Sequence, residues 1–538
     1  GGGYTGSAVS SATYTITGGG SSLIVSDGQP TGTLAGGTTQ VTMQVTTNDA
    51  AICNWATSSG MSYASMPNTF TTTGGTSHNT LLTGLADGQS YARYVRCQDG
   101  SGYANISDYV VSFSVGTDVP ASIASVQAAF AAEPMRGTVY YYCDCGPGAE
   151  GDCVAGDDAN AGTSSSAPRR TIASAMALVN SLTGTNTVAL CKGGAFAAAG
   201  RLNITKSNCT AGTTCTDLRE YTPTTFTGTA KPIVKTPSDI ELLYAEGNFG
   251  GVRLMNLALV GDNNPTSMNS YAIRLLYDTH DIKAYNLDIT DFGLAVNFGG
   301  TNNELVGNNI SHSWRMAFLG GGSGTKVNYN LIRTTGSGTN FTHAIYIGGG
   351  TVIYNVEVIG NDIQGQYGSS CLGSVVSNHA AVDGFFVKDN LISIDADKAT
   401  SGCYGMESSN ATDAPAPVFY RNAVFSGNTI INGGAVGLSV SSCPYCVIEN
   451  NVIVSNWIGG WGVGIGITGV TRGQDDVSIA NTIRNNTVWY GPNVVGSTRG
   501  IQVGACGGEG TGHIIANNTV SSAQGAGTLN CYRHDLPL

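Results

Sequence analysis

One short motif recurs through the second half of the chain and constrains its fold more than any other feature. The motif is an Asn followed two positions later by Ile or Val, and it is found at Asn308, Asn330, Asn361, Asn390, Asn428, Asn451, Asn486 and Asn518. Variable spacing of this kind is typical of a solenoid whose coils have about 20 to 25 residues plus inserted loops. One coil cannot bury its apolar face alone, whereas stacked coils can. We expect the repeated Asn to adopt left-handed backbone at a turn and to bond to the Asn of the coils above and below.

A second pattern precedes each Asn and has the period of a strand. Segments such as Ala344-Ile345-Tyr346-Ile347 and Gly437-Leu438-Ser439-Val440 alternate apolar residues with another side chain. Because strand side chains alternate between the two faces, the Ile, Leu and Val residues should point inward and the residue between them outward. The outward row then contains Arg274, Ala295, Tyr346, Glu407, Ser439, Gly466 and Gln502. These patterns predict an all-β chain with a parallel β-helix over 139–538.

Two segments resemble a known superfamily. The stretch Tyr140–Thr171, with Gly162-Thr163 and Pro168-Arg169-Arg170-Thr171, is similar to the leading segment of secreted right-handed parallel β-helix proteins of the pectate-lyase-like kind. Thr342–Ile347 resembles the His-Gly-Ile-Tyr step of β-helix proteins related to polysaccharide lyases and glycoside hydrolases. The resemblance implies a right-handed helix with an N-terminal capping helix. The apolar face of that cap would consist of Ile172, Ala175, Met176, Leu178 and Val179.

The N-terminal part has a different character. Residues 1–20 are rich in Gly, Ser and Thr and read as a flexible leader, while 21–115 show short alternating stretches expected of a small β-sandwich. Within it, 85–91 resembles the turn and tyrosine of a fibronectin type III module, and Cys53 and Cys97 could staple it. We expect 116–138 to be a connector with a short helix near 121–132.

Composition limits the partners and the compartment. Fourteen Cys indicate a disulfide-forming compartment, so we expect a secreted or cell-surface protein whose signal peptide is absent from the chain. A net charge of -12 argues against nucleic acid, and no apolar run has the roughly 18 residues of a membrane span.

Titratable and aromatic residues gather on a few neighbouring coils. Arg315, His343 and Tyr404 precede their strands on the side of the outward row. We therefore assign His343, Tyr346 and Arg315 as catalytic, and the substrate-binding residues are Arg274, Tyr404, Glu407, His379 and Lys388. No metal ligand is assigned among them.

Calcium is the one cofactor that the carboxylates allow. Candidate ligands are Asp278, Asp281, Asp288 and Asp291, and in the Cys-rich leading loop Asp144, Asp152, Asp157 and Asp158. Solvation and turn formation account for both groups as well. Cys443 and Cys446 have the spacing of a redox or metal motif, but without a second Cys or His pair a disulfide is the better interpretation.

Two classes of function fit these observations. The first is an extracellular enzyme that degrades an acidic polysaccharide, as a lyase in preference to a hydrolase, because Glu407 is the one acid securely in the row and a hydrolase needs two. The second is a non-catalytic surface protein that binds a cell-surface glycan, such as an adhesin, a matrix or filament component, or a virus-type receptor-binding spike. The oligomeric state does not follow from the sequence.

Overall fold

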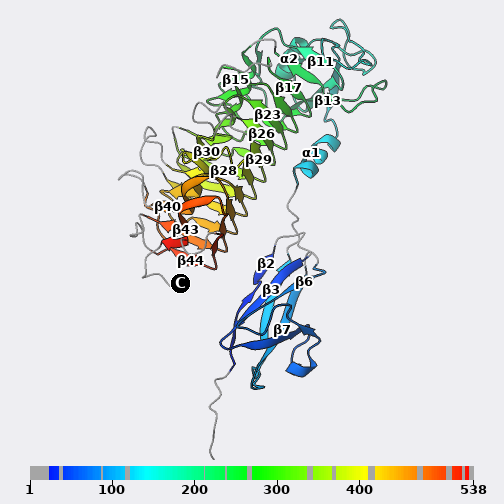
Figure 1. The fold of residues 1–538 in the computed structure, drawn as a ribbon. Helices are drawn as coiled ribbons and strands as arrows, with labels where there is room; N and C mark the ends of the chain where they lie inside the picture. Colours follow the sequence, from blue (N-terminus) through cyan, green and yellow to red (C-terminus); the bar gives the residue numbers. More distant parts are fainter. Residues whose placement is uncertain are drawn as a thin grey trace, which may run out of the picture. The chain divides into compact units, whose positions relative to one another are not determined.

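The chain divides into two compact units in a computed structural model, Gly1–Ala121 and Ser122–Leu538 (Figure 1). The structure describes residues 23–34, 40–85, 89–115, 122–210, 212–236, 239–262, 269–335, 343–349, 351–365, 371–409, 419–468, 476–504, 512–523 and 528–531. The predicted leader 1–20 lies outside the described residues, as do 86–88 of the fibronectin-like segment.

The first unit is a β-sandwich. One sheet has the order β1-β3-β6 and the other the order β2-β8-β7-β4-β5. Its strands are β1 (Val25–Gln29), β2 (Gly32–Leu34), β3 (Gln40–Thr47), β4 (Ala51–Ala56), β5 (Asn68–Thr69), β6 (Ser77–Thr83), β7 (Ser90–Asp99) and β8 (Tyr109–Val115), with a short 3-10 helix at Tyr63–Ser65. Cys53 and Cys97 face each other on β4 and β7 and form the expected disulfide.

The second unit is the predicted right-handed parallel β-helix, in which successive coils contribute strands to each of three parallel sheets. The first sheet contains β9 (Thr138–Tyr142), β10 (Asn186–Cys191), β13 (Thr216–Tyr221), β16 (Val252–Met255), β19 (Lys283–Tyr285), β22 (Glu304–Val306), β25 (Lys326–Asn328), β28 (Ile353–Ile359), β31 (Val382–Lys388), β34 (Tyr420–Arg421), β35 (Val424–Ser426), β38 (Val447–Glu449), β41 (Thr482–Arg484) and β44 (Ile514–Ala516). The second sheet contains β11 (Ala195–Ala197), β14 (Ile233–Lys235), β17 (Ala258–Val260), β20 (Asp288–Thr290), β23 (Asn309–Ser313), β26 (Leu331–Thr335), β29 (Asp362–Gly365), β32 (Leu391–Ile394), β36 (Thr429–Ile431), β39 (Val452–Ser455), β42 (Thr487–Tyr490) and β45 (Thr519–Ser522).

The third sheet bears the candidate site. It contains β12 (Leu202–Asn203), β15 (Glu241–Glu246), β18 (Tyr271–Leu276), β21 (Leu294–Phe298), β24 (Met316–Gly320), β27 (Ile345–Ile347), β30 (Gly373–Asn378), β33 (Cys403–Ser408), β37 (Val436–Ser441), β40 (Gly459–Thr468), β43 (Val494–Val503) and β46 (Thr528–Cys531). Between the sheets runs one continuous apolar core, in which like residues stack from coil to coil. The second sheet shows this best, with Ile310, Ile332, Ile363, Ile392, Ile430 and Ile453 in register and nearly inaccessible to solvent.

The repeated Asn residues form a ladder at the turn between the first and second sheets. The backbone N–H and the Nδ2 of Asn308 both donate to Oδ1 of Asn330, at 3.0 and 2.9 Å. The same pair of bonds links each of the eight Asn to the next, as far as Asn518. The ladder confirms the predicted bonding.

The left-handed backbone of this turn lies elsewhere than we expected. The residue before each ladder Asn has a positive φ, from Gly307 (71°) to Asn517 (55°), and the ladder Asn itself does not. Our prediction for the Asn was wrong, because two different residues supply the left-handed backbone and the ladder amide. The preceding residue turns the chain from the first sheet to the second, and the Asn side chain then lies along the helix axis.

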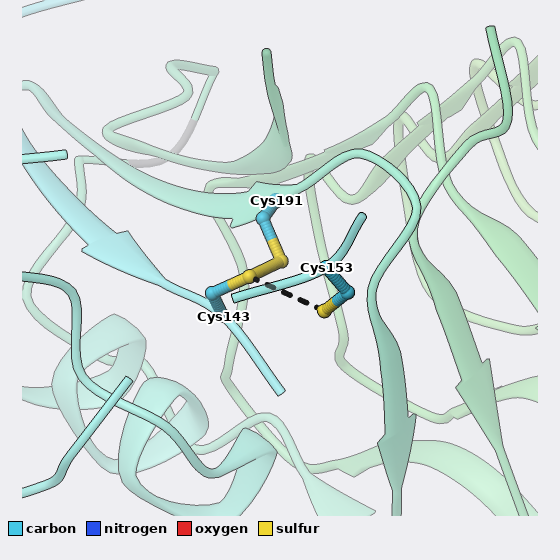
Figure 2. Close-up of side chains that lie close together, drawn as sticks. All are labelled: Cys143, Cys153 and Cys191. Carbon is cyan, nitrogen blue, oxygen red and sulfur yellow. Dashed lines mark hydrogen bonds between the residues drawn. A yellow bond between two sulfur atoms is a disulfide. The ribbon is translucent and has the colours of Figure 1, made fainter. Parts of the chain in front are cut away.

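The N-terminal end of the β-helix is capped and cross-linked. Helix α2 (Ile172–Ser181) is N-capped by Thr171, whose side-chain oxygen accepts a hydrogen bond from the backbone N–H of Ser174. The helix buries Ile172, Ala175, Met176 and Val179 as predicted, whereas Leu178 is only partly buried. The disulfide Cys143–Cys191 ties the segment before the cap to β10, and Cys145–Cys153 closes the loop within that segment. Figure 2 shows Cys153 beside the Cys143–Cys191 disulfide, with its sulfur 3.8 Å from that of Cys143.

The predicted connector helix packs on the β-helix. In α1 (Ile123–Ala132) the ring of Phe130 stacks on Tyr285 at 4.3 Å, and Gln127 Nε2 donates to the Gly307 carbonyl. After α1, Arg136 pairs with the fully buried Asp217. This segment therefore belongs to the β-helix unit, which starts at Ser122.

Further disulfides join Cys209 to Cys215, Cys371 to Cys403 and Cys443 to Cys446, and the last of these confirms our interpretation of that motif. Among the described residues, no helix is long and apolar enough to cross a membrane. The disulfides are consistent with an extracellular protein.

Candidate functional site

The outward residues of the third sheet form one continuous row. Strand register places side by side Arg274, Asn297, Leu319, Tyr346, Ser377, Glu407, Ser439, Gly466 and Gln502. Ser377 lies in this row but is fully buried. Our assignment of Ala295 to this row was wrong, because Ala295 is fully buried and Asn297, between the buried Val296 and Phe298, takes that place. The prediction also missed Leu319 and Ser377.

Three aromatic rings meet where this row crosses β27 and β30. The ring of Tyr346 lies 5.1 Å from that of His343 and 5.2 Å from that of His379. Tyr346 Oη and His379 Nδ1 are 3.2 Å apart, and His379 Nε2 lies 3.2 Å from the hydroxyl of Ser377. A chain of hydrogen bonds thus runs from Tyr346 through His379 to Ser377, along which a proton can be shared.

His343 is more buried than we expected. Its side chain was predicted to face solvent, but the residue is 7 % exposed. Ala344 and Ile345, which follow it, are both fully buried, so the alternation of faces breaks between His343 and Tyr346. His343 thus lies three positions before the outward residue of its coil, close against Tyr346.

Burial determines the protonation state of His343. Desolvation lowers the pKa of His343 to about 4, and the nearby charges of His379 and Arg315 act in the same direction. The imidazole is therefore neutral at pH 7. Its Nδ1 lies 2.6 Å from the Ser374 carbonyl oxygen, which can only accept, so Nδ1 carries the proton and Nε2 keeps a lone pair.

Glu407 is connected to the same group through Ser374. The hydroxyl of Ser374 donates to one carboxylate oxygen of Glu407, and that of Ser409 donates to the other at 2.6 Å. Because Ser374 also supplies the carbonyl that binds His343, it connects the carboxylate with the imidazole. Sequence reasoning assigned no role to Ser374, Ser377 or Ser409.

Arg315 and Tyr404 border this cluster. Arg315 immediately precedes β24, and its charge acts on His343. Tyr404 lies three residues before Glu407 on β33, where burial and then the charge of Glu407 raise the pKa of its phenol. We define the central cluster as His343, Tyr346, Ser374, Ser377, His379, Tyr404 and Glu407, with Arg315 at its edge.

Two residues assigned to substrate binding lie away from the central cluster. Arg274 belongs to the same row, but on β18, three coils before Tyr346. Lys388 ends β31 in the first sheet, where its ammonium lies 5.3 Å from the ring centre of Phe386. We assigned Lys388 to substrate binding because it lies near a turn of the same coil, but that turn is on another side of the β-helix.

The candidate calcium ligands have protein partners. Asp158 accepts from the backbone N–H groups of Arg170 and Thr171, at 2.9 and 3.1 Å, and Asp288 pairs with Lys231 at 2.9 Å. Among the described residues, the one group close enough to hold a metal ion is Cys143, Cys153 and Cys191, all of which are in disulfides. Calcium binding stays a prediction.

Comparisons with known proteins found distant similarity in structure alone. Neither a protein-family model nor a curated protein matches the chain. A GH136 lacto-N-biosidase from Eubacterium ramulus is 12% identical, with a TM-score of 0.42 over 71% of this chain and 68% of its own. A family 28 exopolygalacturonase from Yersinia enterocolitica is 10% identical (TM-score 0.34, 89% of this chain and 96% of its own). The Dettilon tailspike protein is 14% identical (TM-score 0.36, 73% and 70%). At these scores the likenesses carry no argument about activity.

Proposed function

We propose that the protein is an extracellular lyase that cleaves an acidic polysaccharide by β-elimination at the central cluster. The observation that carries the proposal is the neutral His343, fixed with a lone pair on Nε2 and in contact with a tyrosine that is itself hydrogen-bonded to a second histidine. Removal of a carbon-bound proton needs a base with a free lone pair and a nearby group that can give a proton to the leaving oxygen.

The reaction needs three tasks to be divided among the side chains. His343 removes the proton from the carbon next to the sugar carboxylate through the lone pair on Nε2. The electron pair then forms a carbon–carbon double bond while the bond to the glycosidic oxygen breaks, and Tyr346 gives its phenolic proton to that oxygen. The hydrogen bond to His379 holds the phenolate until the proton taken up by His343 passes back to it. The charge of Arg315 lies close enough to oppose the negative charge that develops on the carboxylate.

The acids of this face favour elimination over hydrolysis. Glycoside hydrolysis in its usual form uses two carboxyl groups about 5 to 9.5 Å apart. In the outward row, and among the described residues three positions before it, Glu407 is the single carboxylate between Arg274 and Gln502. It already accepts hydroxyl hydrogen bonds on both oxygens.

The test is a screen of the full-length protein against a panel of polyuronates for new absorbance near 235 nm, with and without EDTA. We expect turnover that Tyr346→Phe and His343→Ala each lower at least about 100-fold, the lower range of a general acid–base contribution. His312→Ala is the matched control, because this His is 66% exposed in its side chain on the second sheet and should not affect turnover.

Other results would redirect the proposal. New reducing ends without absorbance would indicate hydrolysis, and loss of turnover in EDTA would give the charge-neutralising task to calcium instead of Arg315. Glycan binding without turnover, unaffected by Tyr346→Phe, would favour the non-catalytic surface protein.

A further inference from the structure

A second group of charged and aromatic side chains lies on the third sheet, away from the central cluster. We call it the N-terminal cluster and define it as Arg201, Glu241, Tyr244, Glu246, Tyr271 and Arg274. Its members belong to β15 and β18, apart from Arg201, which directly precedes β12. Tyr244 and Arg274 are neighbours in the outward row that also contains Tyr346.

The two arginines are held in fixed orientations. Arg274 Nη1 donates to Oε1 of Glu241 at 2.6 Å, and Arg201 Nη1 lies 3.8 Å from Oε2 of the same carboxylate. The guanidinium of Arg201 lies 4.0 Å from the ring centre of Tyr244, and that of Arg274 lies 4.8 Å from the ring centre of Tyr271. The Tyr244 hydroxyl donates to Glu246. One carboxylate and two rings, together with Asn203 Oδ1, which accepts from Arg201 Nε at 3.1 Å, thus orient both guanidinium groups.

Stability does not account for this arrangement. The side chains of Arg201 and Arg274 are 43% and 32% exposed, and ion pairs at such positions contribute about 0 to 1 kcal/mol. The buried pair of Arg253 with Asp217, in contrast, lies under α1 and its following segment, and its side chains are 10% and 0% exposed. The N-terminal cluster is bonded within itself and open to solvent.

Its free donors suit a carboxylate. A guanidinium has five N–H donors; Arg274 uses one of them on Glu241, and Arg201 uses Nε on Asn203 Oδ1 at 3.1 Å beside its ion pair with Glu241. Nε of Arg274 is buried and has no hydrogen-bond partner within the described part of the chain, so the donors that Arg274 offers to a ligand are on its Nη atoms. Arginines that are already oriented bind planar carboxylates through two parallel hydrogen bonds.

The distance to the central cluster matches a polymer substrate. Arg274 and Tyr346 are separated by three coils of about 4.8 Å each, hence about 14 Å along the helix axis, a span of several sugar units. Both side chains point to the same side of the sheet, so one extended glycan chain can contact both.

We propose that the N-terminal cluster is a second binding site, which takes a carboxylate-bearing sugar of the same acidic glycan several units away from the bond that the central cluster breaks. This inference rests on the proposed function for the nature of the glycan. The second site makes the protein select for chain length, because an oligosaccharide too short to span both clusters gains nothing from the arginines.

The test uses the full chain and a series of oligouronates from two to eight sugars. Calorimetric binding is measured in a Tyr346→Phe background, so that cleavage does not interfere. We expect the affinity to rise steeply at the length that spans both clusters, and Arg201→Gln with Arg274→Gln to remove this rise, weakening the long oligouronates about 10- to 100-fold, the effect of a lost charge-assisted hydrogen bond. Binding of the shortest oligouronates should not change.

The matched control is Arg421→Gln on the first sheet. Arg421 lies 4.0 Å from the ring centre of Phe419 and pairs with Asp476 at 2.8 Å, which is the same chemistry on a different sheet. It should leave all affinities unchanged. If the double variant binds long oligouronates as tightly as the parent, or if neutral oligosaccharides of equal length bind as well as uronates, the second site is refuted. A length-dependent, arginine-dependent affinity in a protein that cleaves no polyuronate would support the second site while rejecting the proposed reaction.

Discussion

Replacing Asn361 by Ala tests whether the Asn ladder stabilises the β-helix. Asn361 is 1% exposed and lies in the middle of the ladder. Its Oδ1 accepts from the backbone N and from Nδ2 of Asn330, at 2.9 and 3.0 Å, and its Nδ2 donates to the Val327 carbonyl at 2.7 Å and to Oδ1 of Asn390 at 2.9 Å. Truncation removes four hydrogen bonds at once.

The cost follows from what happens to the four partner groups. Nδ2 of Asn330 still donates to the Leu305 carbonyl, and Oδ1 of Asn390 still accepts from the backbone N of residue 361. The backbone N of Asn330 and the Val327 carbonyl lose the bonds to Asn361 at a buried position. At about 1 to 3 kcal/mol for each buried group left unsatisfied, we expect the free energy of unfolding to fall by about 2 to 6 kcal/mol.

Urea unfolding of the full chain measures the loss, and hydrogen exchange of the Asn330 amide locates it. The matched control is Asn518→Ala at the end of the ladder, where the residue is only partly buried and water can replace the lost bonds. It should cost less than half as much. Equal losses at both positions, or an Asn330 amide that stays protected in Asn361→Ala, would show that the ladder follows from the fold without stabilising it.

Three further predictions concern other parts of the molecule. Acid should destabilise the β-helix through His343: its pKa is about 4 when folded against 6.5 when unfolded, so up to about 3 kcal/mol present above pH 6.5 is lost as the pH falls to 4, and His343→Asn should show a shallower pH dependence of unfolding. Deleting 1–121 should leave the unfolding transition of the β-helix unchanged, whereas deleting 1–138 should lower its midpoint, because it also removes Phe130 from Tyr285 and Arg136 from Asp217. Reduction of the six disulfides found among the described residues should lower thermal stability by about 2 to 4 kcal/mol for each bridge that closes a long loop, such as Cys143–Cys191, measured by calorimetry with and without reductant.

The fold was predictable because its strongest constraint repeats. Each Asn occupies the same turn, which is buried in every coil before the last, so the sequence must supply the same side chain again and again, and eight copies are visible without an alignment. The coils at Leu257 and Leu287 interrupt the motif for a local reason. There α1 covers the turn, Leu takes the ladder position, and Asn256, one residue earlier, donates to the Phe130 carbonyl while its Oδ1 accepts from Asn286 Nδ2. The packing of α1 could not be predicted, because it depends on a ring contact between residues 155 positions apart (130 and 285).

The candidate site was predictable only as far as strand alternation holds. Tyr346 and Glu407 each lie between two inward residues, so alternation placed them correctly in one row. It failed for His343, because the third sheet has two buried residues in succession before the outward position, and a pattern of period two cannot represent that bend.

Ser374 and Ser377 were missed for a different reason. In the other strands of the row from Arg274 to Gln502, a Gly or Ala stands two residues before the outward residue, but in this coil that position is Val375. A search for the Gly or Ala therefore misses the coil. The register would have found the coil: Ile345-Tyr346-Ile347 pairs with Val376-Ser377-Asn378, so an apolar residue, an outward polar residue and a buried residue recur in the same order one coil later. A repeat unit aligned on its inward residues, with no requirement for the turn residue, brings Ser377 beside Tyr346 and Glu407 from the sequence alone. Sites on β-helices are therefore better sought by stacking the inward positions of successive coils than by searching for turn motifs.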